Sequence, residues 1–193
     1  MIVYDITKEM FSADAYPGDP IPRVRPLKTI PAGDGYHLSR ISIGSHISTH
    51  IDAPMHFIEG GRDCASIDIS RCMGPCVVVT AHGEITAGTM QKILTEQQRP
   101  SRILFRGHVL LTEAAARALT VYDVKLVGFD SLHIASPEVE SLVHVELLQQ
   151  DVVILEDVNL DQIKDGRYFL VALPLKMEGL DGSPTRAVLM LED

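Results

Sequence analysis

Apolar and polar residues alternate along residues 41–56, where the sequence has its most regular pattern. The odd positions carry the apolar or methyl-bearing residues Ile41, Ile43, Ile47, Thr49, Ile51, Ala53 and Met55. The even positions carry the small or polar residues Ser42, Gly44, His46, Ser48, His50, Asp52 and His56. Because successive side chains of a β-strand point to opposite faces, the alternation predicts an extended segment with one face in the core and one polar face.

Shorter patterns predict the other elements of the fold. Apolar runs predict strands at residues 2–6, 76–80, 103–105, 124–129, 152–155, 168–173 and 187–191. Helices are predicted over residues 86–97, 112–119 and 136–150. Thr86 and Thr112 are suitable N-caps for the first two, and Pro137 after Ser136 is typical of the start of the third. With turns at residues 16–20 and 180–184, the pattern predicts a mixed α/β fold that is richer in strand than in helix.

The composition is that of a globular chain that needs no metal ion or disulfide in order to fold. The chain has 193 residues, of which 46% are apolar. A chain of this length buries roughly 70% of the surface that its unfolded form exposes. A metal ion in this protein would therefore serve chemistry rather than folding. No repeat, low-complexity tract or linker interrupts the sequence, so residues 1–193 are predicted to form a single domain.

The charge and the cysteines indicate which partners and compartment to expect. There are 17 Lys and Arg residues against 26 Asp and Glu residues, and the net charge of −9 argues against a nucleic-acid partner. No apolar run approaches the ~20 residues of a membrane-spanning helix, and Asp5 interrupts any secretory signal. Cys64, Cys72 and Cys76 lack the paired pattern of a secreted scaffold. We therefore expect a cytoplasmic protein with reduced thiols and no membrane partner.

Four groups that can bind metal or transfer protons lie within eleven residues on the polar face of the alternating segment. They are His46, His50, Asp52 and His56, at spacings of four, two and four residues. A lone histidine in such a segment is most often a hydrogen-bonded surface or strand residue, but four groups together favour a site. On a straight strand His46 and His50 would be ~13 Å apart, so the segment must bend or hold two ions. Pro54 cannot donate to a central ladder, which predicts that the strand ends near residue 48 or 49.

The types of donor atom narrow the chemistry. Imidazole and carboxylate suit Zn²⁺ or Mn²⁺, whereas Mg²⁺ prefers oxygen and Cu⁺ prefers sulfur. The cluster contains no cysteine, which favours a catalytic site over a structural cage, because catalytic sites keep one coordination position open for water. The two carboxylate oxygens of Asp52 can bridge two cations. The residues therefore predict metal-dependent hydrolysis.

Residues 45–57 have the sequence SHISTHIDAPMHF, which resembles the signature of the metal-dependent cyclase-like hydrolases. This family includes bacterial kynurenine formamidases and isatin hydrolases. Smaller similarities at residues 5–7, 16–20, 128–130 and 181–186 extend the resemblance over nearly the whole chain. The resemblance implies a compact β-rich domain of the swivelling β/β/α type, a homodimer and a small-molecule amide substrate. In formamidase-like members a distal His and a Glu twelve residues later complete a two-zinc site, and His144 and Glu156 have that separation here.

The resemblance also implies a role for each residue of the site. Five residues would bind two Zn²⁺ ions per chain, with Mn²⁺ as the other candidate metal. These ligands are His46, His50, Asp52, His144 and Glu156. Asp52 would bridge the two ions, His56 would transfer the proton in catalysis, and Tyr16 would bind the substrate. Without the resemblance, His144 would be an ordinary helical histidine and Glu156 an ordinary residue at a strand end.

This chain departs from the family pattern at three positions. The family usually has glycine in place of Ser48, commonly tryptophan in place of Tyr16, and often asparagine in place of Asp157. The smaller ring of Tyr16 predicts weaker stacking on a flat substrate, with Met55 and Phe57 as further candidates for the pocket wall. Asp157 predicts additional negative charge beside the ligands.

The most specific activity that the resemblance implies is arylformamidase activity, which converts N-formylkynurenine to kynurenine and formate in tryptophan catabolism. Two alternatives stay open. An isatin or lactam hydrolase would use the same site, although the distal ligands of isatin-type members differ from a His and a Glu. A catalytically silent metal-binding protein would keep the fold without turnover. His56 argues against that alternative, because a pure binding site needs no proton-transfer residue.

Overall fold

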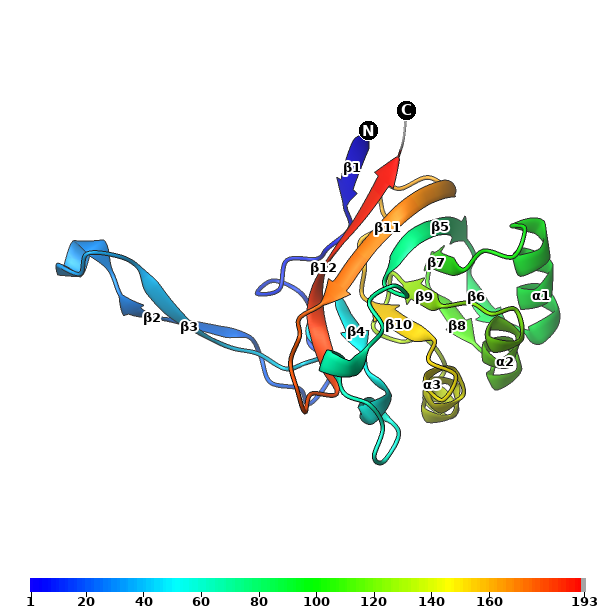
Figure 1. Ribbon diagram of the computed structural model, residues 1–193, viewed down its shortest axis with the longest axis horizontal. Helices are drawn as coiled ribbons and strands as arrows, with labels where there is room; N and C mark the ends of the chain where they lie inside the picture. The colour runs from blue at the N-terminus through cyan, green and yellow to red at the C-terminus, as the bar shows by residue number, and fades with distance from the viewer. Residues whose placement is uncertain (192–193) are drawn as a thin grey trace.

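The computed structural model describes residues 1–191, and its centre is an eight-stranded sheet (Figure 1). In spatial order the strands are β1 (Ile2–Asp5), β12 (Gly182–Leu191), β11 (Gly166–Pro174), β5 (Met73–Thr80), β7 (Arg102–Arg106), β9 (Leu126–Phe129), β10 (Val153–Glu156) and β4 (His50–Asp52). The first residues of β12 also pair with β4, at the other end of this order. The sheet therefore closes into a barrel, and β1 is added to the outside of β12.

Three helices lie beside the parallel strands of the sheet. Strands β5, β7, β9 and β10 are parallel, and they are connected through α1 (Ala87–Glu96), α2 (Glu113–Val121) and α3 (Glu140–Leu148). Two short parallel strands, β6 (Gly83–Ile85) and β8 (Val109–Leu111), lie in the connections. The fold is thus a β-rich α/β fold, as the sequence predicts. Within residues 1–191 no helix combines the length and hydrophobicity that a membrane crossing requires.

Two hydrophobic clusters pack on opposite faces of the sheet. The first lies between the sheet and the helices, and Met90 of α1 and Phe105 of β7 belong to it. The second lies on the other face and contains Ile51 of β4 and Leu155 of β10, which are register partners. Burying a side chain of this size contributes roughly 1.5–3 kcal/mol. Because Ile51 packs into the second cluster, its neighbours in β4 point to the side of the sheet that the helices cover.

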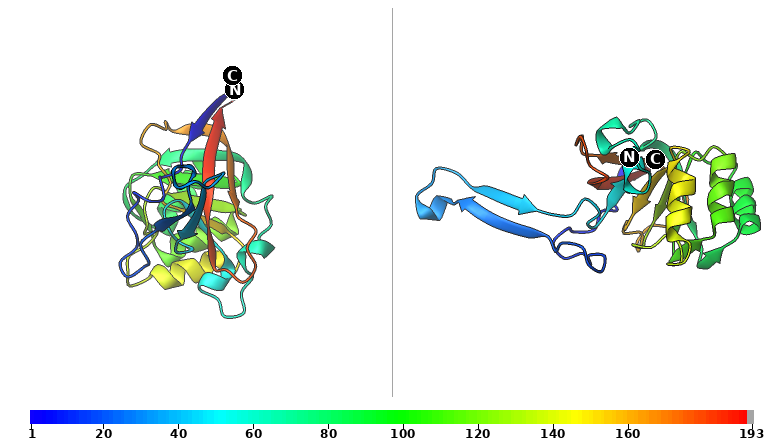
Figure 2. Two further views of the ribbon diagram at one scale, coloured as in Figure 1. Left: turned by 90° about the vertical axis from the view of Figure 1, so that its left-hand side faces the viewer. Right: turned by 90° about the horizontal axis from the view of Figure 1, so that it is seen from below.

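A long hairpin projects from the body of the molecule, as Figures 1 and 2 show. It consists of β2 (Arg23–Lys28) and β3 (Leu38–Ser42), which form a separate antiparallel sheet, with a 3-10 helix at Ile30–Ala32 between them. Every residue of the two strands is exposed. We call residues 21–43 the arm. The sequence patterns did not predict β2, because no apolar alternation marks a strand that is exposed on both faces.

The single strand predicted within residues 41–56 is wrong in its extent. Residues 41–42 are the end of β3 and His50–Asp52 forms β4, and residues 45–49 between them form the bend, which was predicted to follow residue 48 or 49. The backbone of Ser48 has a φ of +56°, which turns the chain immediately before β4. Ile47, Thr49, Ile51 and Ala53 are buried as predicted. In contrast, Ile41 is 57% exposed because it lies on β3 of the arm, and Met55 is 37% exposed in the 3-10 helix Pro54–His56 that follows β4.

The other boundaries differ by a few residues from the predicted ones. Thr86 and Thr112 cap α1 and α2 as predicted. The third helix begins at Glu140 rather than at 136, because Val139 has a non-helical φ of −125° and the preceding residues form a turn. The turn predicted at residues 180–184 ends early, since Gly182 is already the first residue of β12.

Candidate metal centre

Closure of the barrel brings the predicted site residues together. β4 carries His50 and Asp52, and the strand register places Glu156, the last residue of β10, opposite His50. His144 comes from α3, which packs beside β10. His46 precedes β4 in the bend and reaches the carboxylate of Asp52. Residues that are 110 positions apart in sequence, such as His46 and Glu156, therefore belong to one cluster.

Two carboxylates in this cluster face three imidazoles. Asp52 Oδ1 lies 2.9 Å from His46 Nδ1 and 3.3 Å from His50 Nε2. Glu156 Oε2 lies 3.4 Å from the same nitrogen of His50. His144 Nε2 lies 3.5 Å from Asp52 Oδ2 and 3.4 Å from Glu156 Oε1. All of these residues except His46 are buried, so the charges interact with little screening by solvent.

Two carboxylate oxygens of the cluster have no hydrogen-bond donor within residues 1–191. They are Asp52 Oδ2 and Glu156 Oε1, and both are buried. The nearest nitrogen, Nε2 of His144, lies beyond the usual hydrogen-bond distance from both. A buried carboxylate oxygen without a partner costs free energy, and a bound cation removes that cost. The residues therefore fit a metal ion.

The donor atoms fall into two overlapping groups, and within each the atoms lie within 4.8 Å of one another. One group is His46, Asp52 and His56, and the other is His50, Asp52 and Glu156. Asp52 belongs to both groups, so its carboxylate can bridge two ions. The first group contains His56, to which the resemblance gave proton transfer rather than metal binding. His56 lies close enough to His46 and Asp52 to bind a metal ion together with them or to transfer a proton beside it.

Backbone carbonyls orient two of the imidazoles. His50 Nδ1 donates to the carbonyl oxygen of Ser48 at 2.7 Å, and His144 Nδ1 donates to that of Glu140 at 2.8 Å. Because a carbonyl oxygen only accepts, Nδ1 carries the hydrogen and Nε2 of the neutral ring keeps its lone pair. In both residues Nε2 points to the carboxylates. The chain thus presents two preoriented nitrogen donors to a metal ion.

The imidazoles and carboxylates shift each other's pKa strongly. Burial alone would lower the pKa of His144, but the carboxylates of Asp52 and Glu156, which face its Nε2, raise it to about 10. The same balance raises the pKa of His50 well above its usual value. Burial alone would raise the pKa of Asp52, but the three imidazoles hold it well below its usual range. A metal ion that binds at neutral pH therefore displaces protons from the histidines, and its affinity falls as the pH falls.

A third carboxylate, that of Asp181, borders the cluster and was not among the predicted site residues. Asp181 Oδ2 lies 3.1 Å from His46 Nε2 and 3.6 Å from His56 Nδ1. The rings of His46 and His56 stack at a centroid distance of 3.8 Å. Asp181 can therefore orient both rings. The one sequence signal for it was its position in the segment 181–186 that resembles the family.

Gly182 leaves the space that His46 occupies. A Cβ atom at position 182 would lie 2.5 Å from Cε1 and 2.8 Å from Nε2 of His46. Such distances are shorter than any van der Waals contact allows, so a larger residue would displace the imidazole. The glycine at the start of β12 thus helps to position a candidate ligand.

A cavity of about 390 Å³ opens beside the cluster, within the range of roughly 300–1,000 Å³ that is typical of ligand sites. It is lined by Tyr16, Asp19, His56, Phe57, Leu132, Pro137, Glu140, Ser141, His144 and Glu156. The ring of Phe57 stacks on His144 at 4.4 Å, and Tyr16 makes an edge contact with His133 at 5.3 Å. Both aromatic residues expected at the pocket therefore line it. Met55 is absent from this lining of described residues.

Two of the three positions that depart from the family pattern, Ser48 and Asp157, are stabilised by neighbouring residues. Ser48 and Asp157 both have a φ of +56°, in the left-handed region that glycine, asparagine and aspartate adopt most readily. The Ser48 hydroxyl donates to the carbonyl oxygen of Lys8 at 2.9 Å, which holds the bend. The carboxylate of Asp157 forms an ion pair with Lys8 Nζ. The negative charge predicted at position 157 is thus balanced by a lysine.

Lys8 connects the two segments that carry candidate ligands. Its backbone N–H donates to Thr49 Oγ1 at 2.9 Å, and the Thr49 hydroxyl donates to the carbonyl oxygen of Asp157 at 2.6 Å. Thr49 precedes His50, and Asp157 follows Glu156. The N-terminal segment therefore ties the bend before β4 to the end of β10.

Lys8→Met should lower the free energy of unfolding of the metal-free protein by about 1–3 kcal/mol, because it leaves the 3%-exposed Asp157 carboxylate without its cation. A second change, Asp157→Asn, should restore most of this loss in the Lys8→Met background, since a neutral amide tolerates both the burial and the left-handed backbone. Urea unfolding of the wild type, the single variant and the double variant measures the effect. Equal destabilisation in the single and double variants would contradict it.

Comparison with known proteins identifies the family. A family model described as a putative cyclase matches residues 4–136. The kynurenine formamidase of Delftia acidovorans is 30% identical over 201 residues, which cover 97% of this chain and 96% of that enzyme. A solved structure described as a potential metal-dependent hydrolase with cyclase activity is 30% identical, with a TM-score of 0.83 and coverage of 100% of this chain and 99% of that one.

The fold extends to more distant proteins. An isatin hydrolase bound to the product analogue thioisatinate superposes with a TM-score of 0.84 over 99% of this chain and 92% of that one. Its sequence is 19% identical, so this is a likeness of fold alone. The family match covers well over half of the chain, and the formamidase relative is matched over nearly its full length. The chain therefore belongs to the cyclase family of metal-dependent hydrolases.

Proposed function

We propose that this metal-dependent amide hydrolase is an arylformamidase, which converts N-formylkynurenine to kynurenine and formate. The observation that carries the proposal is the pair of donor groups that share Asp52 and lie beside a cavity with aromatic walls. An aryl formamide joins a flat ring to a very small acyl group. A substrate of that shape needs a narrow carbonyl site next to an aromatic surface. The relatives named kynurenine formamidase support this choice of substrate.

We propose the five clustered residues as the metal ligands. His46, His50, Asp52, His144 and Glu156 would hold two divalent ions, with Asp52 as the bridge. Zn²⁺ is the proposed metal and Mn²⁺ the second candidate, since both accept imidazole together with carboxylate. Within residues 1–191, Asp52 Oδ2 and Glu156 Oε1 have no hydrogen-bond donor, which indicates that the imidazoles alone do not satisfy the two carboxylates. Bound divalent ions would supply the additional positive charge.

In this proposal the chain's own residues orient the substrate and move the proton. Bound divalent ions lower the pKa of a water molecule and polarise the substrate carbonyl. The rings of Tyr16 and Phe57 hold the aromatic part of the substrate at the cavity wall. His56 takes a proton as water adds to the formyl carbon, and returns it to the aniline nitrogen as the C–N bond breaks. Asp181, 3.6 Å from His56 Nδ1, keeps the imidazole oriented while formate and the free amine leave.

The proposed substrate is tested by following kynurenine release from N-formylkynurenine with protein loaded with Zn²⁺ or Mn²⁺. Isatin and a simple lactam are assayed in parallel. We expect turnover of N-formylkynurenine, some turnover of related anilides, and little opening of the two rings. Efficient opening of isatin or the lactam with N-formylkynurenine untouched would contradict the formamidase assignment and favour the cyclic amide hydrolase. Absence of any turnover would favour the catalytically silent metal-binding protein.

We also propose that the chain forms a single domain that works as a homodimer in the cytoplasm. Both hydrophobic clusters pack on the same sheet, which supports one domain. Cys64, Cys72 and Cys76 are free and buried, and burial raises the pKa of the Cys64 thiol to about 11 and of the other two to about 12. Protonated, unpaired thiols suit a reducing compartment. The exposed apolar side chains of the projecting arm, Val24 and Ile41 among them, support a second copy.

A further inference from the structure

A second cavity opens at the carboxyl ends of three parallel strands of the sheet. Its volume is about 410 Å³, and we call it the second cavity, whereas the cavity of about 390 Å³ beside the candidate metal centre is the first cavity. Its lining segments follow β7, β9, β10 and β1. Its walls include Lys8, Asp14, His108, Leu132, His133 and Asp157. In α/β folds, ligands commonly bind outside the carboxyl ends of parallel strands, so this position is typical of a ligand site.

The two cavities share a thin wall of side chains. Leu132 lines both of them. The ring of Tyr16, in the first cavity, makes its edge contact at 5.3 Å with the ring of His133, in the second. His133 Nδ1 in turn lies 3.3 Å from Oε1 of Glu140, which lines the first cavity. A single layer of side chains therefore separates the two cavities.

The end of β10 brings the second cavity close to the candidate metal centre. Glu156, a candidate ligand, lines the first cavity, and the next residue, Asp157, lines the second. The Cα atoms of adjacent residues are only about 3.8 Å apart. In N-formylkynurenine, five bonds of roughly 1.5 Å join the amide nitrogen to the α-carbon of the amino-acid group, which is an extended span of about 6 Å. A substrate whose formyl group lies at the candidate metal centre can therefore place its amino-acid group in the second cavity.

The second cavity offers donors to a carboxylate. Lys8 Nζ forms its ion pair with Asp157, and an ammonium group has three hydrogens, so two of them are left for a ligand. The side chain of His108 is exposed, and within residues 1–191 neither of its ring nitrogens has a hydrogen-bond partner. Of the described residues, none that lines the first cavity is Lys or Arg. A substrate carboxylate therefore finds its cationic partner in the second cavity.

The second cavity also offers an acceptor to an ammonium group. Asp14 is exposed, and in the part of the chain that the structure describes its carboxylate has neither an ion-pair partner nor a hydrogen-bond donor. Lys8 and Asp14 therefore give the cavity groups of opposite charge. A simple anion or a simple cation would use only one of them, whereas the zwitterionic group of an α-amino acid uses both.

We infer that the second cavity binds the α-amino-acid group of the substrate, with Lys8 and His108 on its carboxylate and Asp14 on its ammonium group. The inference rests on the proposed arylformamidase function, and it adds the residues that select among aryl formamides. The ketone that joins the ring to the amino-acid group then passes the shared wall at Tyr16 and Leu132. Lys8, His108 and Asp14 lie away from the bond that breaks, so their loss should raise KM more than it lowers kcat.

Two formamides that differ only in the amino-acid group test the inference. N-formylkynurenine is compared with 2-formamidoacetophenone, which has the same ring, ketone and formamide but a methyl group in place of the amino-acid group. The wild type should prefer N-formylkynurenine by about 100-fold in kcat/KM, because hydrogen bonds to each of the two charged groups contribute about tenfold. This preference is the quantity to compare among variants.

Each charge of the second cavity is removed in a separate variant. Asp14→Asn keeps the size of the side chain and removes the acceptor charge for the ammonium group. Lys8→Met/Asp157→Asn removes the donor for the carboxylate, and the second change is included because Lys8→Met alone should destabilise the fold. Each variant should lower the preference for N-formylkynurenine by about tenfold, mainly through KM.

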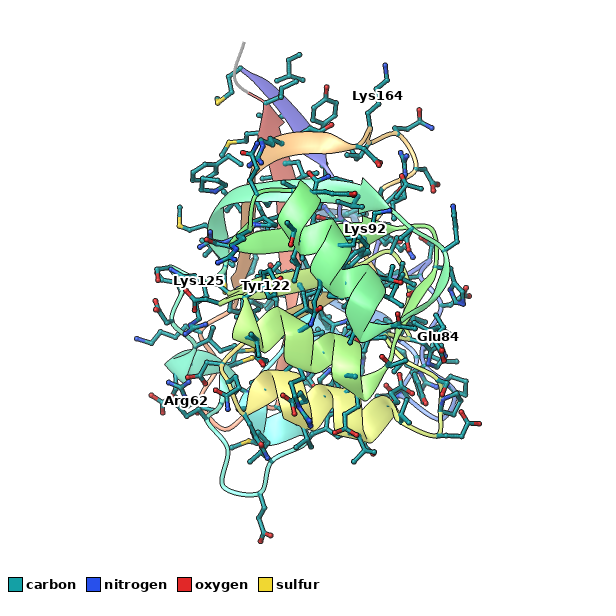
Figure 3. All side chains as sticks on the ribbon, turned by 90° about the vertical axis from the view of Figure 1, so that its right-hand side faces the viewer. Arg62, Glu84, Lys92, Tyr122, Lys125 and Lys164 are labelled. Atoms are coloured by element: carbon teal, nitrogen blue, oxygen red, sulfur yellow. The ribbon has the colours of Figure 1, made fainter. Side chains whose placement is uncertain are left out.

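A matched control removes a lysine from another surface. Lys92 projects from the outer surface of α1, as Figure 3 shows, and its side chain is 74% exposed. It lines neither of the two cavities. Lys92→Met should therefore keep the wild-type preference. Circular dichroism and the metal content of each variant check that the fold and the candidate metal centre are retained.

A binding measurement that needs no turnover accompanies the kinetics. Calorimetry compares kynurenine with 2-aminoacetophenone, the corresponding amine without the amino-acid group. Kynurenine should bind the wild type at least about tenfold more tightly, and Asp14→Asn and Lys8→Met/Asp157→Asn should each reduce that difference.

The outcomes separate the inference from the proposed function. Equal kcat/KM for the two formamides in the wild type would overturn the inference and leave the arylformamidase intact. A preference for N-formylkynurenine that both variants keep would also overturn it. If neither formamide is hydrolysed, the proposed function fails and calorimetry decides the inference. Tighter binding of kynurenine that depends on Lys8 and Asp14 would then support the second cavity as its site, and equal binding of the two amines would overturn it.

Discussion

Asp52→Asn should remove both metal ions from the protein, whereas His46→Ala should remove mainly one. Asp52 belongs to both groups of donor atoms, and its two oxygens face His46 and His50 on one side and His144 on the other. Asparagine keeps the volume and one carbonyl oxygen but removes the negative charge. Each ion would then lose an anionic ligand at the same time. His46 belongs to only one of the two groups, so its loss affects one ion directly.

Elemental analysis of protein purified without chelator measures this difference. The wild type should contain close to two transition-metal ions per chain, His46→Ala about one, and Asp52→Asn close to none. Replacement of residues that merely support a metal ligand typically costs 10–100-fold in affinity or activity, so the loss of activity in Asp52→Asn should exceed about 100-fold. A wild type with one ion that added Zn²⁺ does not increase would contradict the two-ion proposal. Equal metal content in the two variants would contradict the bridge.

The local part of the candidate site was readable from the sequence. His46, His50, Asp52 and His56 are close in sequence. A straight strand would hold His46 and His50 ~13 Å apart, so a bend or two ions had to be expected there. The structure has that bend at residues 45–49, before β4 rather than after it. Alternation shows which residues can share a face but does not show where the backbone turns. The left-handed conformation of Ser48, which places the turn, has no signature in a polar residue.

The distant part of the site depended on tertiary structure. His144 and Glu156 join the cluster because β10 pairs with β4 and α3 packs beside β10, and no pattern within either segment reports that pairing. Only the resemblance to a family pointed to them. Asp181 was missed because the closure of the barrel by β12 and β4 brings it beside His46, from a segment predicted to be a simple turn. Residues that become neighbours only when the sheet closes cannot be identified from their spacing in the sequence.

The arm is a second feature that is difficult to predict from the sequence. Sequence-based prediction of strands relies on one apolar face being buried in the chain's own core. Val24 and Ile41 are cross-strand partners but both are more than half exposed, so β2 and β3 have no buried apolar face within the chain for such a prediction to detect.

His56→Ala should lower kcat by ~10²–10⁴ while the protein keeps its metal content, because a positioned acid–base residue contributes about that much. Burial and the neighbouring imidazoles of His46 and His144 lower the pKa of His56, so its ring is neutral at pH 7 and able to accept a proton. Its Nδ1 faces Asp181, and the ring lines the cavity where the substrate is proposed to bind. Nε2, the ring nitrogen that does not face Asp181, is therefore the atom that accepts and returns the proton.

The same geometry allows the opposite result, which makes the experiment decisive. His56 also belongs to the donor group with His46 and Asp52, so a role as ligand would appear as the loss of about one ion in His56→Ala. Asp181→Asn is the matched second variant, because it leaves the imidazole in place and removes only the carboxylate that orients it. If His56 transfers the proton, Asp181→Asn should retain both ions and lose less kcat than His56→Ala, with KM little changed in either variant. If His56 is a ligand, metal content will fall in His56→Ala, and activity will return when Zn²⁺ is added in excess. If His56 is the proton-transfer group, added Zn²⁺ will not restore activity, because a metal ion does not replace the missing imidazole.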